Sequence, residues 1–265
     1  MLSRTRSRYL DKEVYFFDCD GTLYLGSRVI PGARELIRKI ADAGKSFFYF
    51  TNNSSRSDLD YVRKLKKMGF PVTRDQVIVS SQTVAPYLEK RSGPKIKRAY
   101  VLGLPALKMM LRRDGIHHDR NRPQMVIVGF DKTLTYEKLC LAARFIEKGL
   151  PWIMVHPDRY CPTDEGCEPD AGSIGALLET ATGRKAEVAL GKPHPLMMKL
   201  GLSRAGAKAR DALLIGDRLS TDIEMAMQAG IDSVLVLSGE TKRKDIPKKW
   251  RTKMLVVSSV KDLLE

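Results

Sequence analysis

The sequence predicts an α/β protein in which helices wrap a parallel sheet. Short apolar runs rich in β-branched and aromatic residues alternate with segments of helical periodicity along the 265 residues. This alternation is typical of strand–helix–strand units, whose helices cover a parallel sheet. Polar residues directly follow several of the apolar runs, at the strand ends where open parallel sheets bind their ligands. We therefore expect the functional residues at the carboxyl edge of the sheet.

The N-terminal part is expected to contain two strands, each followed by a helix. Residues 14–17 form an apolar run typical of a buried strand, and residues 46–50 form a second one. The helix between them is expected to start near Pro31 and to end at Gly44. A serine-rich segment caps the next helix, which ends before Gly69.

The rest of the chain repeats this alternation. Helices are expected over residues 82–90 and through Ile223, Met225 and Met227. Further strands are expected at residues 77–79, 100–102, 125–128, 152–155, 212–215, 233–237 and 254–257.

The composition is that of an ordinary globular protein, with 43% hydrophobic and 29% charged residues. No apolar run reaches the roughly 18 residues that a membrane helix needs, and residues 1–8 lack the apolar core of a secretory signal. We therefore expect a cytoplasmic protein without membrane contact. Its four cysteines are too few for a disulfide framework and are expected as reduced thiols.

The formal net charge of +15 attracts anions, a class that includes both phosphorylated metabolites and nucleic acids. The densest basic run spans residues 242–253 and contains Trp250 as its one aromatic residue. Nucleic-acid sites usually interleave aromatic and basic residues, so we interpret this run as a solvated face and expect no nucleic-acid partner.

The segment Asp18-Cys19-Asp20-Gly21-Thr22 directly follows the first strand. Residues two apart on an extended chain project to one side, and Gly21 permits a tight turn. A carboxylate can attack phosphorus, while a second can protonate the leaving oxygen and later activate water. Two adjacent negative charges favour a bridging cation, for which Mg²⁺ is the natural choice. A turn with solvated acids is the alternative for this segment alone.

Three further polar segments occupy similar positions. Thr51 and Asn52 follow the second strand and could donate hydrogen bonds to phosphoryl oxygens, or could simply cap a helix. Lys192, in a loop stiffened by prolines, could neutralise the transferred group, although single lysines are usually solvated. Asp217 follows the 212–215 strand and could complete a metal shell, while Asp222 could hold Lys192 or water at the metal.

In this order the four segments resemble the four signature motifs of the haloacid dehalogenase superfamily. The resemblance implies a Rossmann-like parallel sheet core in which Asp18 attacks phosphorus and Asp20 acts as general acid and then base. It also implies that Mg²⁺ is held by the carboxylates of Asp18 and Asp217 and by the backbone carbonyl of Asp20. The phosphoryl oxygens would then be bound by Thr51, Asn52 and Lys192, with Asp222 in support.

Members of this superfamily differ in where a cap domain is inserted. Residues 23–50 separate the first two motifs, whereas residues 53–190 separate the second from the third. The chain therefore resembles the NagD-like branch, which includes nitrophenyl, phosphoglycolate and pyridoxal phosphate phosphatases. This implies a discontinuous core of residues 1–81 and 187–265, with an inserted α/β cap at 82–186 that selects the substrate.

Two segments of the expected cap are candidates for substrate contact. Asp158 ends an apparent strand, and Asp170 or Ser173 could face the site from a helix start. Helix capping is an equal alternative for the second segment. His117 and His118 lie among charged residues and are expected on the surface.

The sequence thus predicts Mg²⁺-dependent hydrolysis of small phosphate monoesters through a phosphoaspartate, with a small phosphorylated metabolite as partner. Caps of related enzymes often pair, so a homodimer through the cap is one expectation, while the sequence leaves the oligomeric state open. A dehalogenase is disfavoured because its reaction would give Asp20 no role. A phosphomutase is disfavoured because, by resemblance, its cap is inserted between the first and second motifs. The alternative from another class is a non-catalytic or nucleic-acid-associated protein that uses the same fold and its basic surface.

Overall fold

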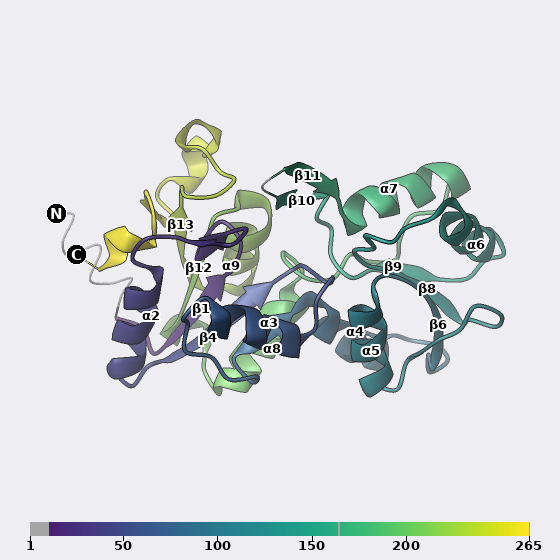
Figure 1. Cartoon of the computed structure of the whole chain (residues 1–265), viewed down its shortest axis with the longest axis horizontal. Helices are drawn as coiled ribbons and strands as arrows, with labels where there is room; N and C mark the ends of the chain where they lie inside the picture. Colours follow the sequence, from purple (N-terminus) through teal and green to yellow (C-terminus); the bar gives the residue numbers. More distant parts are fainter. Residues whose placement is uncertain (1–10, 164, 265) are drawn as a thin grey trace. The chain divides into compact units, whose positions relative to one another are not determined.

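The computed structural model describes residues 11–163 and 165–264 and divides them into two compact units (Figure 1). Within the described residues, the first unit comprises 11–51, Tyr61–Ile78 and 193–264, and the second comprises Asn52–Asp60 with Val79–Lys192. This division assigns Asn52–Asp60 to the second unit, whereas the sequence placed the boundary at residue 82.

The first unit is built on a six-stranded sheet of order β14-β13-β12-β1-β4-β5. The central strand β1 pairs in parallel with β4 and β12, so that Phe17 lies opposite both Tyr49 and Ile215. This register places the residues that follow β1, β4 and β12 at one edge of the sheet. The strands are β1 (Val14–Asp18), β4 (Ser46–Thr51), β5 (Val77–Val79), β12 (Ala212–Gly216), β13 (Asp232–Val236) and β14 (Leu255–Val257).

Helices and short turns connect these strands. The predicted helix after Pro31 is confirmed, because α2 buries one apolar face of Leu36, Ile37 and Ile40, and the chain leaves it through Gly44 at φ 71°. The helical elements are α2 (Ala33–Asp42), α3 (Asp58–Lys67), α8 (Pro195–Ala205), η2 (Ala209–Asp211), the π-helix η3 (Leu219–Ile223), α9 (Glu224–Ala229), η4 (Arg243–Asp245), η5 (Lys248–Trp250) and η6 (Val260–Leu263).

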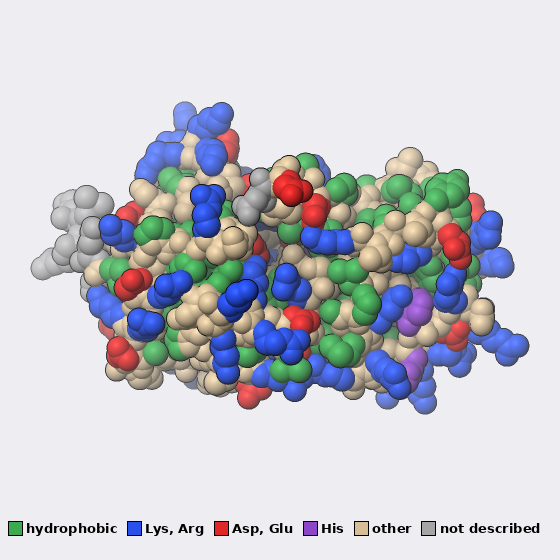
Figure 2. Space-filling view, in the orientation of Figure 1, with side chains coloured by type: hydrophobic (Ala, Val, Ile, Leu, Met, Phe, Trp, Pro, Cys, Tyr) green, Lys and Arg blue, Asp and Glu red, His purple; other side chains and the backbone are tan. Residues whose placement is uncertain are grey.

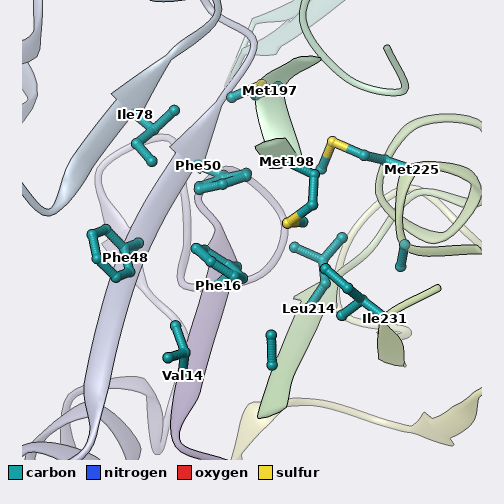
Figure 3. Close-up of a cluster of buried hydrophobic side chains, with 12 residues drawn as sticks. Val14, Phe16, Phe48, Phe50, Ile78, Met197, Met198, Leu214, Met225 and Ile231 are labelled. Atoms are coloured by element: carbon teal, nitrogen blue, oxygen red, sulfur yellow. The ribbon is translucent and has the colours of Figure 1, made fainter. Parts of the chain in front are cut away.

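One hydrophobic core of this unit lies between the sheet and helices α8 and α9 (Figure 3). Alternate residues of β1 and β4 point to this side, where the ring of Phe16 lies 4.8 Å from that of Phe50 and 5.4 Å from that of Phe48. At Gly201 of α8 an added Cβ would lie 2.5 Å from the Phe50 ring, so only glycine permits this close packing. Each buried phenylalanine contributes roughly 1.5–3 kcal/mol through removal from water.

The second unit contains a four-stranded sheet of order β7-β6-β8-β9 and a separate hairpin. Helices α6 and α7 cover this sheet around the buried Trp152, Tyr100 and Phe145. The elements are η1 (Ser80–Thr83), α4 (Val84–Lys90), β6 (Arg98–Leu102), α5 (Pro105–Arg113), β7 (His117–His118), β8 (Met125–Val128), α6 (Tyr136–Glu147), β9 (Trp152–Met154), β10 (Tyr160–Thr163), β11 (Gly166–Pro169) and α7 (Ala171–Thr182).

The predicted strands therefore all exist, and the parallel α/β fold is confirmed. Three short strand pairings were not anticipated, because they are two to four residues long and carry little periodicity: the β2 (Tyr24–Leu25) and β3 (Arg28–Val29) hairpin, the β10–β11 hairpin, and edge strand β7.

The surface position expected for His118 is only partly correct, because this side chain is half-buried. Its Nδ1 accepts a hydrogen bond from the backbone N–H of Val101 at 3.0 Å, and its ring lies 5.5 Å from that of Tyr100. Burial, followed by the nearby positive charges of Lys108 and Arg120, lowers the pKa of His118 to about 4. His117 is exposed, as predicted.

The basic run lies on the surface. All lysines and arginines between 242 and 253 are exposed, and Lys and Arg side chains are spread widely over the molecular face in Figure 2. All four cysteines are free thiols. Within residues 11–163 and 165–264 no helix has both the length and the apolarity needed to span a membrane.

Candidate active site

Three buried carboxylates meet at the carboxyl edge of the first unit's sheet. Asp18 ends β1, Asp217 follows β12, and Asp222 lies in η3. Each offers an oxygen, and these oxygens all lie within 4.8 Å of one another. Burial, followed by the negative charges of Asp18 and Asp222, raises the pKa of Asp217 well above its ordinary value. The cluster therefore resists carrying its full negative charge.

The surroundings of Asp217 fit a hard divalent cation. Among the described residues its Oδ1 is buried and has no hydrogen-bond partner, while its Oδ2 accepts the Glu240 N–H at 2.7 Å. A Cβ added at Gly21 or at Gly239 would overlap this carboxylate, so both glycines leave room for it. An all-oxygen donor set with an orphaned buried oxygen is suited to Mg²⁺.

The two carboxylates of the first motif are held by different groups. Asp18 Oδ2 accepts the Thr22 hydroxyl at 3.1 Å, within a turn where Gly21 adopts φ 90°. Asp20 Oδ2 accepts the Tyr24 hydroxyl at 3.2 Å, and its Oδ1 lies 3.8 Å from Lys64 Nζ. The two carboxylates are thus oriented independently, as their different predicted roles require.

Tyr24 and Lys64 form a packed support for Asp20. The Lys64 ammonium lies 3.8 Å from the centroid of the Tyr24 ring, a cation–π contact. Burial, followed by the Cys19 thiol and the Asp20 carboxylate, raises the pKa of Tyr24 well above its usual value, so the phenol stays protonated and donates. Neither residue could be recognised from the sequence, because a lysine on the polar side of a helix is usually solvated and a tyrosine outside the motif carries no signal of its own.

Thr51 is buried at the end of β4, where its hydroxyl donates to Tyr61 Oη at 3.2 Å. Its register beside β1 places it at the same sheet edge as Asp18. A phosphoryl contact from this hydroxyl stays a prediction.

Asn52 and Lys192 are held together in the second unit. The Lys192 N–H donates to Asn52 Oδ1 at 2.7 Å, and Asn52 Nδ2 donates to the Lys192 carbonyl at 3.0 Å. Gly191 has φ 68°, and a Cβ there would lie 2.6 Å from Asn52 Oδ1. The side chain of Asn52 therefore positions the backbone of Lys192, a contact that the sequence alone did not indicate.

The predicted substrate residues of the second unit make internal contacts. Asp158 Oδ1 accepts Asn52 Nδ2 at 3.0 Å, Asp170 caps α7 by accepting the Ala171 N–H at 2.6 Å, and the Ser173 hydroxyl donates to the Arg159 carbonyl at 2.5 Å. For Asp170 this contact matches the helix-capping alternative, and substrate contact stays a prediction for all three residues.

Residues 15–117 match the family of haloacid dehalogenase-like hydrolases, and residues 189–263 match a second family described as HAD-hydrolase-like. This chain belongs to the haloacid dehalogenase-like hydrolases. The first match contains the segments of Asp18 and Thr51, and the second contains those of Lys192 and Asp217.

Several of the similar proteins are named as phosphatases or as a nucleotidase. The 5′-nucleotidase YutF of Bacillus subtilis is 32% identical over 86% of this chain and 88% of its own length. The 4-nitrophenylphosphatase of Thermotoga maritima is 41% identical, with a TM-score of 0.88 over 96% of each chain. The glycerol phosphate phosphatase of Mycobacterium tuberculosis, solved in complex with magnesium, is 31% identical, with a TM-score of 0.87 over 97% of this chain and 77% of its own.

These likenesses confirm the prediction of a NagD-like enzyme of the phosphatase class. They do not favour the alternative of a non-catalytic or nucleic-acid-associated protein. The individual site residues remain assigned by motif and geometry alone.

Proposed function

We propose that the protein is a Mg²⁺-dependent phosphatase that hydrolyses small phosphate monoesters through a phosphorylated Asp18. One observation carries the proposal: the buried cluster of Asp18, Asp217 and Asp222 at the carboxyl edge of the sheet. Three carboxylates packed this closely repel one another and an anionic substrate, and a bound divalent cation relieves both repulsions. The magnesium complex of the glycerol phosphate phosphatase supports the choice of ion.

The proposed first step is attack of an Asp18 carboxylate oxygen on phosphorus. A new P–O bond forms to Asp18 while the ester P–O bond breaks, and Asp20 gives its proton to the departing alkoxide. In the second step Asp20 takes a proton from water, whose oxygen attacks phosphorus and releases inorganic phosphate, regenerating the Asp18 carboxylate. Tyr24 and Lys64 keep Asp20 oriented through both steps.

Phosphoryl oxygens would be bound by the Thr51 hydroxyl, by Asn52 and by the Lys192 ammonium. These donors match the charge that develops on the equatorial oxygens during transfer. We propose that Asp217 and the backbone carbonyl of Asp20 complete the cation's protein ligands. The second unit would select the substrate, and the names of the relatives support small phosphate monoesters as the class. The cytoplasmic location and a homodimer through this unit stay predictions.

The test is phosphate release from 4-nitrophenyl phosphate and from a panel of sugar, nucleotide, glycolyl and pyridoxal phosphates. We expect activity with Mg²⁺, none in excess chelator, and none in Asp18→Asn. Because general acid–base catalysis supplies about 10²–10⁴-fold, Asp20→Asn should lower kcat by that factor. Full activity in Asp18→Asn would refute the nucleophile assignment. Strong salt-dependent retention on DNA or RNA by a protein without phosphatase activity would instead support the nucleic-acid alternative.

A further inference from the structure

His156 is a wholly buried histidine between two carboxylates of the second unit. Its Nε2 lies 3.0 Å from the Ser54 hydroxyl and 3.5 Å from Asp170 Oδ1, while its Nδ1 lies 3.9 Å from Asp158 Oδ2. Among the described residues, His156 Nδ1 has no hydrogen-bond partner. A buried polar atom without a partner is rare in native proteins and calls for an explanation.

The hydrogen bonds around Ser54 indicate where the ring proton lies. Ser54 Oγ already accepts the Phe130 N–H at 3.0 Å, so its single hydroxyl proton can be donated to His156 Nε2. The remaining ring proton then belongs to Nδ1. Each neutral tautomer turns one ring lone pair toward a carboxylate, either Nε2 toward Asp170 at 3.5 Å or Nδ1 toward Asp158 at 3.9 Å, so repulsion does not select between them. The hydrogen bonds of Ser54 therefore place an N–H of His156 facing Asp158.

Asp158 lies between His156 and Asn52 and contacts one with each of its carboxylate oxygens. Its Oδ1 accepts Asn52 Nδ2, while the Asn52 Oδ1 accepts the N–H of Lys192. A carboxylate can only accept, and a backbone N–H can only donate, so the two contacts together permit a single orientation of the amide. The chain of contacts runs from His156 through Asp158 and Asn52 to the backbone of Lys192.

We propose that His156 is a positioning residue for phosphate binding. Its Nδ1–H attracts the Asp158 carboxylate, Asp158 sets the orientation of the Asn52 amide, and Asn52 holds the Lys192 backbone from which the phosphate-binding side chain extends. The expected effect of His156 on catalysis rests on the proposed function. The contacts from His156 to Lys192 are independent of that function.

A general structural role is the competing explanation, because this loop is tightly packed. The Gly172 N–H donates to the Asp158 carbonyl at 2.8 Å, and a Cβ at Gly172 would overlap the Pro157 carbonyl. Any large change at His156 could disturb this packing. The test therefore needs two substitutions of similar polarity that differ in which ring nitrogen they replace.

The matched pair is His156→Asn and His156→Gln. The amide nitrogen of asparagine can take the place of Nδ1 and face Asp158, whereas that of glutamine reaches toward the place of Nε2 and Ser54. Loss of the Nδ1–H that faces Asp158 at 3.9 Å, an electrostatic contact longer than a hydrogen bond, predicts about a 5- to 10-fold fall in kcat/KM for 4-nitrophenyl phosphate in His156→Gln. The inhibition constant of inorganic phosphate should rise with it. His156→Asn should stay within about 3-fold of wild type in both measurements.

Hydrogen exchange of the Lys192 amide tests the contact chain without catalysis. In metal-free protein we expect faster exchange at Lys192 in His156→Gln and in Asp158→Ala, and wild-type exchange in His156→Asn. Asp158→Ala also serves if a His156 variant fails to fold. As a control for general loosening of the second unit, His118→Gln should lower the melting temperature and leave Lys192 exchange unchanged.

Equal effects of the Asn and Gln substitutions, or unchanged Lys192 exchange in both His156→Gln and Asp158→Ala, would overturn the proposal. If the wild-type protein releases no phosphate from any ester, the proposed function fails, and the exchange result still decides the role of His156.

Discussion

Gly239 leaves the space that the carboxylate of Asp217 occupies, because a Cβ at Gly239 would overlap Asp217 Oδ2. The Gly239→Ala substitution should therefore push Asp217 away from Asp18 and weaken cation binding. We expect the Mg²⁺ concentration for half-maximal activity to rise about 10-fold or more, since one lost ligand contact costs on the order of 1–3 kcal/mol. A magnesium titration of phosphatase activity measures this.

Gly44 supplies the matched control for Gly239. It has φ 71° and nothing within 4 Å of an added Cβ, so Gly44→Ala introduces backbone strain without a clash. We expect Gly44→Ala to lower the melting temperature and to leave the Mg²⁺ requirement unchanged. An equal shift of the Mg²⁺ requirement in both variants would contradict the steric argument.

Asp18→Asn should stabilise the metal-free protein while removing its activity. The substitution removes one of three carboxylates that are buried together and repel one another when ionised, and an asparagine oxygen can still accept the Thr22 hydroxyl. In excess chelator we expect the melting temperature to rise by about 2 °C or more. Added Mg²⁺ should raise the melting temperature of wild type more than that of the variant. A lower melting temperature of Asp18→Asn in chelator would show that the cluster is not repulsive.

Lys64→Met should lower kcat, because Lys64 helps to orient the proposed general acid and base Asp20. The methionine keeps much of the packing on Tyr24 but removes the positive charge 3.8 Å from Asp20 Oδ1. We expect kcat to fall about 10-fold and KM to change little, because the phosphoryl donors are separate from Asp20. Lys67→Met, at an exposed position of the same helix, is the control and should retain full activity. Steady-state kinetics on 4-nitrophenyl phosphate distinguishes the two variants.

His118 should make the protein less stable in acid. Its folded-state pKa is lowered from 6.5 to about 4, so the unfolded chain binds more protons between these values and stability falls as pH falls from about 6.5 to 4. Protonation of Nδ1 would also break its hydrogen bond with the Val101 N–H. His118→Asn keeps an acceptor near this position and does not titrate.

Thermal unfolding from pH 7 to pH 4 checks this role of His118. We expect the wild-type melting temperature to fall more steeply than that of His118→Asn between pH 6.5 and 4, and the two curves to run parallel above pH 7. Parallel curves over the whole range would exclude His118 as a source of acid instability.

Local properties of the chain were enough to predict the α/β fold and the core of the site. Continuous apolar runs such as Val14–Phe17 mark buried parallel strands, because both faces of such strands are covered. Asp18 and Asp217 could be placed near one another because the carboxyl ends of parallel strands share an edge. Short pairings such as β2–β3 could not be predicted, because a strand of two residues is too short to show the alternation of apolar and polar residues that marks a strand.

The sequence by itself determined which residue types stand at the strand ends, and through them the chemistry of the acidic cluster. Only the tertiary structure decided which groups orient those residues. Lys64 meets Asp20 through the packing of α3, and Asp158 meets Asn52 across 106 positions of the chain. Such contacts depend on how separate elements pack, and periodicity reports only which face of its own element a residue occupies.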